Sequence, residues 1–214
     1  MNSIFISILL HDIIALITII NPIAAASIMI SMISPPTASA IADVARKATL
    51  TVFAASFVTL FGGEVVFQFF GINIYSIKII GGIILMLIAI NMAYGHGAKN
   101  RHSPEEAQEA QEKEDIAIVP LGIPILFGPG VIATIVVLSH NNSSQLHPAL
   151  SYILLSIAIL IASLATYLTL RYASIINKAL GVTGIKILTR IMGLIVGAIA
   201  AQFLISGIKG LWEA

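Results

Sequence analysis

Long apolar runs alternate with short polar stretches along the whole chain. A transmembrane helix needs about 20 predominantly apolar residues. The pattern therefore predicts six membrane segments, which cover residues 3–33, 48–70, 74–94, 119–139, 149–172 and 187–212. Residues 95–115 form a strongly polar stretch, and residues 141–147 are expected to be a short polar loop.

Composition supports this pattern. The 214 residues are 58% hydrophobic and only 10% charged, against about 25% charged residues in soluble domains. A net charge of +1 argues against a nucleic-acid partner, and the absence of cysteine excludes disulfides, thiolate catalysis and cysteine metal sites. We expect an all-α integral membrane protein with one transmembrane domain.

The first segment contains a break. As one straight helix, residues 3–33 would extend about 45 Å, longer than a hydrocarbon core of about 30 Å. The Asn21-Pro22 pair near its middle predicts two half-helices or a strongly tilted helix. A cleaved signal peptide is the alternative, but residues 1–10 carry no Lys or Arg.

The fourth segment is interrupted more strongly. Pro120, Pro124 and the run Gly128-Pro129-Gly130 lie within an apolar stretch. Proline removes a backbone donor and clashes with the preceding helical turn. Backbone freed in this way is tolerated in a membrane only where it lines a cavity or is buried in protein. A broken helix also marks the binding site of many transporters.

Two polar stretches should carry short helices of their own. Residues 38–47 predict an amphipathic stretch before the second segment, and Ser103-Pro104 with two following acids predicts a surface helix over residues 104–114. Nine of the eleven Lys and Arg residues fall on the side opposite the termini. The positive-inside rule then places both termini outside a bacterial cytoplasmic membrane.

The two halves of the chain resemble each other. Asn21-Pro22 corresponds to Gly128-Pro129, and Lys78 with Gly81 corresponds to Arg190 with Gly193. Three spans per half require the halves to insert with opposite orientation. We therefore expect two inverted three-helix repeats, residues 1–107 and 108–214, with helices 1 and 4 broken; chance similarity between apolar segments is the alternative.

These features resemble the MarC family of six-span bacterial inner-membrane proteins, also called UPF0056. Pro120-Leu121, Pro124 and Gly128-Pro129-Gly130 resemble its P-L-x-x-P-x-x-x-G-P-G motif, and Asn21-Pro22 resembles its first-span N/D-P element. The resemblance covers nearly the whole chain. It implies a six-span fold, and some members are described as small neutral amino-acid transporters. Ala24 and Ser27 stand where many members have Gly and Pro, so the first break should be less sharp.

The two breaks supply the candidate substrate-binding residues. The carboxamide of Asn21 beside Pro22 can bond freed backbone or a polar solute, or can simply cap a kink. Gly128, Pro129 and Gly130 can expose a half-helix N-terminus, whose partial positive charge suits a carboxylate. Close helix packing is the alternative for these small residues.

Further polar side chains are candidates with weaker support. Ser27 and Thr134 flank the breaks and can add hydroxyls, or can bond their own helix backbone. Gln202 is a candidate binding residue, and Asn91 a candidate coupling residue; both could instead make packing hydrogen bonds. Glu64 is, with Asp12, one of two carboxylates well inside a span. It is a possible coupling group or an interfacial anchor.

These features together predict a secondary transporter of small neutral amino acids, such as alanine or glycine, working by alternating access. Coupling to protons or sodium is possible. A non-transporting membrane scaffold, or an exporter or channel for another small solute, is the alternative. We expect no enzyme activity, no cofactor and no metal, because the sequence has no nucleotide loop, no catalytic triad and no metal-ligand spacing.

Overall fold

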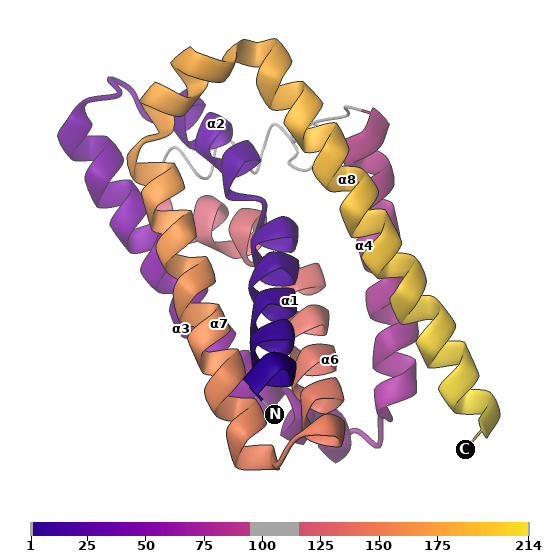
Figure 1. Cartoon of the computed structure of the whole chain (residues 1–214). Coiled ribbons are helices and arrows are strands. Elements are labelled where there is room, and N and C mark those ends of the chain that lie inside the picture. The colour runs from indigo at the N-terminus through magenta and orange to yellow at the C-terminus, as the bar shows by residue number, and fades with distance from the viewer. Residues whose placement is uncertain (1, 95–115, 214) are drawn as a thin grey trace.

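The computed structural model describes residues 2–94 and 116–213, and these residues form helices and no strand. Five helices are long and apolar enough to cross a membrane, or six if one bent pair counts as a single span. The all-α membrane fold with six segments is therefore confirmed. Both termini lie at the same end of the bundle (Figure 1), as an even number of crossings requires.

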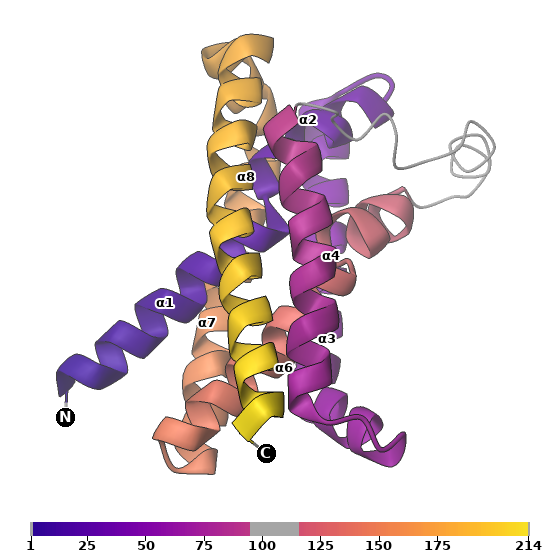
Figure 2. The same cartoon turned by 90° about the vertical axis from the view of Figure 1, so that its right-hand side faces the viewer.

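The first segment is broken where the sequence predicts it. α1 (Asn2–Ile20) ends at Asn21, and α2 (Pro22–Met32) begins with proline at its first position. Asn21 adopts the left-handed conformation, with φ 50° and ψ 61°, which Asn tolerates better than most residues. Proline at the first helical position loses no hydrogen bond because that N–H has no helical partner. α1 slants away from the other helices toward its N-terminus (Figure 2).

The fourth segment is also broken. η2 (Ala117–Leu126) is a widened helix, in which Leu121 and Phe127 donate N–H bonds to carbonyls five residues earlier. Val119 and Ile123 are extended within it, because each precedes a proline. α6 (Pro129–Gln145) follows, and the two helices meet at an angle of 57°. α6 continues through residues 141–145, so the polar loop predicted there is shorter than expected.

Two other boundaries differ from the sequence expectation. α3 (Ala38–Phe69) is one continuous helix, so residues 38–47 are its first turns and not a separate stretch. Thr37 caps it by accepting the N–H of Ala40 at 3.2 Å, and no Gly or Pro interrupts it before Gly62. α8 (Ala173–Glu213) starts earlier than residue 187 and turns at Gly181, where φ is +60°. The surface helix predicted over residues 104–114 lies outside the described residues.

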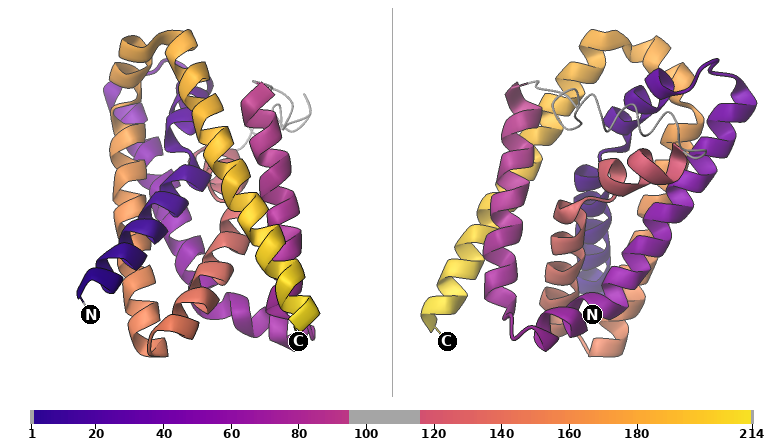
Figure 3. Two further views of the ribbon diagram at one scale, coloured as in Figure 1. Left: turned by 45° about the vertical axis from the view of Figure 1, so that its right-hand side comes forward. Right: turned by 180° about the vertical axis from the view of Figure 1, so that it is seen from behind.

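The remaining spans, α4 (Ile74–Tyr94) and α7 (Pro148–Arg171), agree closely with the expected segments. α4 packs along α8, and this pair stands beside the group formed by α1, α3, α6 and α7 (Figure 3). Glycine permits the close approach of α4 and α8. A Cβ on Gly193 would lie 3.1 Å from the Ala89 carbonyl oxygen, and one on Gly82 would lie 2.9 Å from that of Ala200.

The packing of the helices is reciprocal between the two halves of the chain. α4 packs on α8 and α3 on α7, which are the corresponding third and second spans of each half. α3 also contacts η2 and α6, whereas α7 contacts α1 and α2. Such exchange of equivalent contacts is compatible with two inverted repeats. The division at residues 107 and 108 stays a prediction, because it falls outside the described residues.

Candidate functional site

A cavity of about 300 Å³ lies at the break of the fourth segment, between η2, α6, α1 and α4. This volume is at the lower end of the range for small-ligand pockets. The break of the fourth segment contributes more residues to this cavity than the break of the first segment does. Gly128, Pro129 and Gly130 line the cavity, whereas the first segment contributes Ile19, two residues before Asn21.

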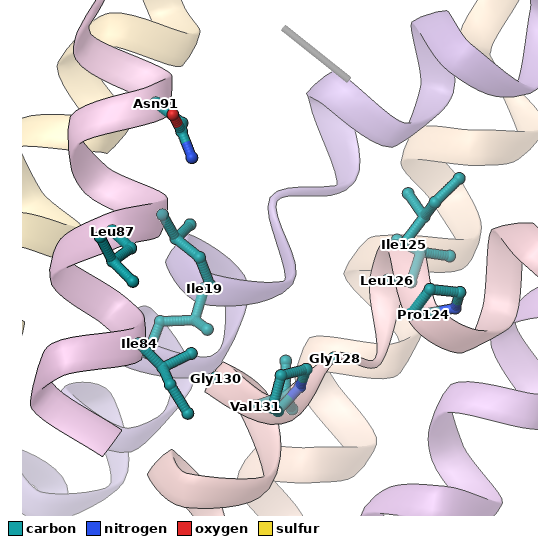
Figure 4. A pocket seen from close by; sticks show the side chains of 12 residues that line it. Ile19, Ile84, Leu87, Asn91, Pro124, Ile125, Leu126, Gly128, Gly130 and Val131 are labelled. Atoms are coloured by element: carbon teal, nitrogen blue, oxygen red, sulfur yellow. The ribbon is translucent and has the colours of Figure 1, made fainter. Parts of the chain in front are cut away.

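The walls of the cavity are mainly aliphatic. Figure 4 shows Ile84 and Leu87 on α4 facing Ile19 of α1, with Ile125 and Leu126 of η2 on the other side. Asn91 contributes the only polar side chain among the lining residues that the structure describes, and no charged side chain lines the cavity there. Any other polar group in this lining belongs to the backbone. This lining suits a small solute without net charge.

The N-terminus of α6 opens at this cavity. Gly128 is extended, with φ −106° and ψ 179°, and no side chain of the described residues caps the helix. Its carbonyl accepts the N–H groups of Val131 at 2.9 Å and Ile132 at 3.3 Å. Pro129 has no N–H, so the N–H of Gly130 is the donor of the first turn that is left for a ligand, and it lies at the positive end of the helix dipole. The N-terminus of α6 can therefore stabilise an anionic group of a ligand.

Gly130 is required by the closeness of α4. A Cβ at this position would lie 2.9 Å from Cδ2 of Leu85 and 3.1 Å from Cδ1 of Ile88. Ile88 itself lines the cavity. Gly130 can therefore serve both helix packing and the binding site. Because it has no side chain, α4 can pack closely against it and the cavity stays open.

The other predicted binding residues lie away from this cavity. Pro22 is buried at the start of α2. Ser27 donates a hydrogen bond of 2.9 Å to Oδ1 of Asn177 on α8. Thr134 is fully buried and donates to the Gly130 carbonyl at 2.8 Å, so its hydroxyl bonds its own helix. Gln202 is exposed on α8.

Glu64 lines a second, smaller cavity of about 200 Å³ near the end of α3. Gln68 donates a long hydrogen bond of 3.4 Å to Glu64, and Nδ1 of His140 lies 4.0 Å from the same carboxylate. The Glu64 side chain is 41% exposed. Glu64 and Asn91, the two candidate coupling residues, thus lie in different cavities.

No role was predicted for Asp12 from the sequence, and Asn142 was expected to lie in a loop. Asp12 is fully buried in α1, and Asn142 on α6 donates a hydrogen bond of 2.6 Å to its Oδ2 atom. The sequence feature that could have indicated a role for Asp12 is its position within an apolar segment. Its partner lies 130 residues away, and no local pattern connects the two.

The chain matches a known protein family over almost its full length. The family model described as "MarC family integral membrane protein" matches residues 6–212. The chain belongs to the MarC family. It is therefore an integral, multi-pass membrane protein.

Several MarC family relatives, all named UPF0056 membrane proteins, are similar over most of the chain. YvbG of Bacillus subtilis is 35% identical over 210 residues, which is 96% of each chain. YhcE of Escherichia coli is 34% identical over 93% of this chain and 91% of its own. MJ1677 of Methanocaldococcus jannaschii is 36% identical, covering 92% and 93%. No solved structure matches the chain.

Proposed function

We propose that this MarC family protein is a secondary transporter of small neutral amino acids, such as alanine or glycine. The observation that carries the proposal is the cavity at the broken fourth span. It combines about 300 Å³ of space, aliphatic walls and the N-terminus of a half-helix, with no charged side chain among the described lining residues.

A zwitterion can be bound there without fixed charges. Its carboxylate would meet the N-terminus of α6 at Gly128–Gly130, where the helix dipole is positive. Its ammonium group would meet the carbonyls at the end of η2, which have no helical partner, and the amide oxygen of Asn91. In transporters with broken helices, half-helix N-termini point at anionic groups of the substrate, and freed backbone carbonyls bind cations. A small side chain would lie against Ile84 and Leu87.

Alternating access would follow from movement of one unit of the helix bundle against another. The two units are the α4–α8 pair and the group of α1, α3, α6 and α7, and they contact each other mainly between α4 and α6 (Figure 3). The cavity has walls from both units, since Ile84 and Asn91 belong to α4, and Gly128 precedes α6. Rocking between these units would therefore change which face of the membrane the cavity reaches.

We further propose that the membrane is the bacterial cytoplasmic membrane, with both termini outside. Arg46, Lys47, Arg171 and Lys178 belong to the ends of α3, α7 and α8 that lie opposite the termini. Cytoplasmic ends of membrane segments carry the excess of basic residues.

Counterflow in proteoliposomes tests the function. Purified protein is reconstituted with unlabelled alanine inside, and entry of labelled alanine or glycine is followed over time. Saturable, transient accumulation above the level of protein-free liposomes is expected of a carrier. Flux that does not saturate would indicate a channel. No flux of either amino acid, from protein shown to be folded and inserted, would contradict the amino-acid assignment and favour the scaffold alternative.

A further inference from the structure

Asp12 is a carboxylate without access to solvent in the middle of the apolar helix α1. Its exposed fraction is 0%, and the only other charged side chain that is buried in the described residues is Lys78, at 8%. Burying an ionised carboxylate costs several kcal/mol unless it is paired. Charged residues inside membrane segments are rare and commonly belong to ion or proton pathways.

Each oxygen of Asp12 has one side-chain partner among the residues that the structure describes. The amide Nδ2 of Asn142 donates to Oδ2 at 2.6 Å, which is short for a hydrogen bond to a carboxylate. Nδ1 of His11 lies 3.2 Å from Oδ1. The His11 side chain is 69% exposed. His11 therefore connects the buried carboxylate to the surface of the bundle.

The groups around Asp12 suit a proton better than a metal cation. Asn142 presents its N–H to the carboxylate, not its carbonyl oxygen, and His11 presents a ring nitrogen. Alkali and alkaline-earth cations require several oxygen ligands around them. A proton requires only one carboxylate oxygen, and it removes the charge whose burial is costly.

Other titratable groups do not contact Asp12 in the described residues. On α6 there is His140, which faces Glu64. On α7 there are Tyr152 and Tyr167, with His147 and Arg171 at its two ends. α8 carries Lys178, Lys186, Arg190, Lys209 and Glu213.

The Asp12–Asn142 contact joins the same two helices that meet at the cavity. α1 reaches the cavity at Ile19, about two turns after Asp12, and α6 leaves it at Gly130, about three turns before Asn142. α1 belongs to the first half of the chain and α6 to the second. A change in the contact would therefore alter how these helices sit against each other at the cavity.

We propose that Asp12 is a proton-binding site that couples solute transport to proton movement. A proton adds to Oδ2 of the carboxylate. This is the oxygen that accepts the N–H of Asn142, so the new O–H group displaces that hydrogen bond. The charge-assisted hydrogen bond is lost, α1 separates from α6, and the cavity changes its accessible side. Release of the proton restores the contact. The coupling rests on the proposed transport function, whereas the protonation itself does not.

Accumulation driven by a pH gradient tests the coupling. One proton per neutral amino acid gives up to about tenfold accumulation for each pH unit, because one unit corresponds to about 1.36 kcal/mol. Wild-type proteoliposomes are expected to approach this ratio with labelled alanine. Asp12→Asn keeps the shape of the side chain but cannot be protonated, so accumulation should fall to equality across the membrane. Alanine exchange through this variant should become independent of pH.

The matched control is Asp43→Asn, which removes an exposed carboxylate paired with Lys47 at 3.0 Å at the opposite end of the bundle. Its accumulation should equal that of the wild type. Asn142→Leu should shift the pH at which exchange is half-maximal, because it removes the donor to Asp12. Accumulation that persists in Asp12→Asn, or that follows a sodium gradient and not a proton gradient, would overturn the coupling.

Infrared difference spectroscopy separates the two proposals. Acidification of the wild-type protein should produce a carboxylic-acid C=O band that is absent from Asp12→Asn and present in Asp43→Asn. If neither alanine nor glycine exchanges but this band is observed, the transport function fails while the proton site stands. If the spectra of the wild type and Asp12→Asn are identical, Asp12 does not bind a proton and the inference is wrong.

Discussion

The hydroxyl of Ser27 donates a hydrogen bond of 2.9 Å to the side-chain oxygen of Asn177, across 150 positions of sequence. This bond ties α2, just after the first break, to the beginning of α8. Ser27 was expected from the sequence to bind substrate. Its observed partner is instead a side chain from the other half of the chain, which supports a structural role.

A double-mutant cycle distinguishes the two roles of Ser27. Ser27→Ala and Asn177→Ala should each lower stability in detergent by about 1 kcal/mol, and the double variant should lose little more, because both remove the same hydrogen bond. Thermal unfolding measures the effect. If Ser27→Ala weakens alanine counterflow and Asn177→Ala does not, Ser27 contacts the solute and the structural role is insufficient.

Enlarging Gly130 should impair the cavity. Gly130→Val adds atoms within 3.1 Å of Leu85 and Ile88, and we expect the half-saturation concentration for alanine to rise at least about tenfold, equivalent to about 1.4 kcal/mol. The control is Gly62→Val on α3, where a Cβ meets nothing within 4 Å. Equal effects of the two substitutions would show that the cavity at Gly130 does not bind alanine.

The reactivity of introduced cysteines should show whether water reaches the cavity. The chain has no cysteine, so single substitutions can be labelled in the otherwise natural protein. Asn91→Cys and Ile88→Cys should react with a small hydrophilic thiol reagent, and alanine should slow the reaction. Val58→Cys, 73% exposed on the surface of α3, should react slowly because that surface faces lipid. Rapid labelling of Val58→Cys with no labelling in the cavity would contradict this arrangement.

The packing of α4 on α8 should be more sensitive to substitution at Gly193 than at Gly197, which lies one turn further along α8. A Cβ on Gly193 would lie 2.8 Å from Met92 Cβ and 3.0 Å from the Ala93 backbone nitrogen. Gly193→Ala should therefore destabilise the protein by about 1–3 kcal/mol. On the same helix, a Cβ on Gly197 makes an ordinary 3.4 Å contact, so Gly197→Ala should be neutral or stabilising by up to about 1 kcal/mol. Unfolding midpoints in detergent compare the two.

Reporter fusions to the C-terminus test the membrane orientation. Alkaline phosphatase is active only outside the cytoplasmic membrane, and green fluorescent protein made in the cytoplasm does not fluoresce after export. With the C-terminus outside, the phosphatase fusion should be active and the fluorescent fusion dark. Fusions at residue 94, the end of α4, should behave in the opposite way. The reverse pattern at both positions would mean that the orientation inferred from the basic residues is wrong.

Part of the candidate site could be predicted because its residues are adjacent in the chain. Gly128, Pro129 and Gly130 break a helix by their own backbone chemistry, and Asn21-Pro22 does the same more gently. The partners of these breaks could not be predicted. Asn91 and Ile88 reach the cavity because α4 packs closely on α6, where a Cβ on Gly81 would lie 2.7 Å from Cβ of Ala133 and one on Gly130 would lie 2.9 Å from Leu85.

Two helix boundaries differ from those predicted from the sequence, and each has a local cause. Residues 38–47 join α3 because Thr37 caps the helix and nothing afterwards interrupts it. Residues 141–145 continue α6 although they are polar, and this extension positions Asn142 against Asp12. From sequence alone, a polar stretch at the end of an apolar segment is equally compatible with a loop and with a helix. The residues that it contacts in the folded protein decide between the two.

The sequence by itself determined the membrane class, the number of segments and the two break points, because hydropathy, proline and glycine act on the backbone nearby. Only the tertiary structure decided which side chains share a cavity, that Ser27 bonds Asn177, and that Asp12 is buried against Asn142. Those contacts depend on how helices far apart in the chain pack, and apolar segments of similar composition do not encode their neighbours in any local pattern.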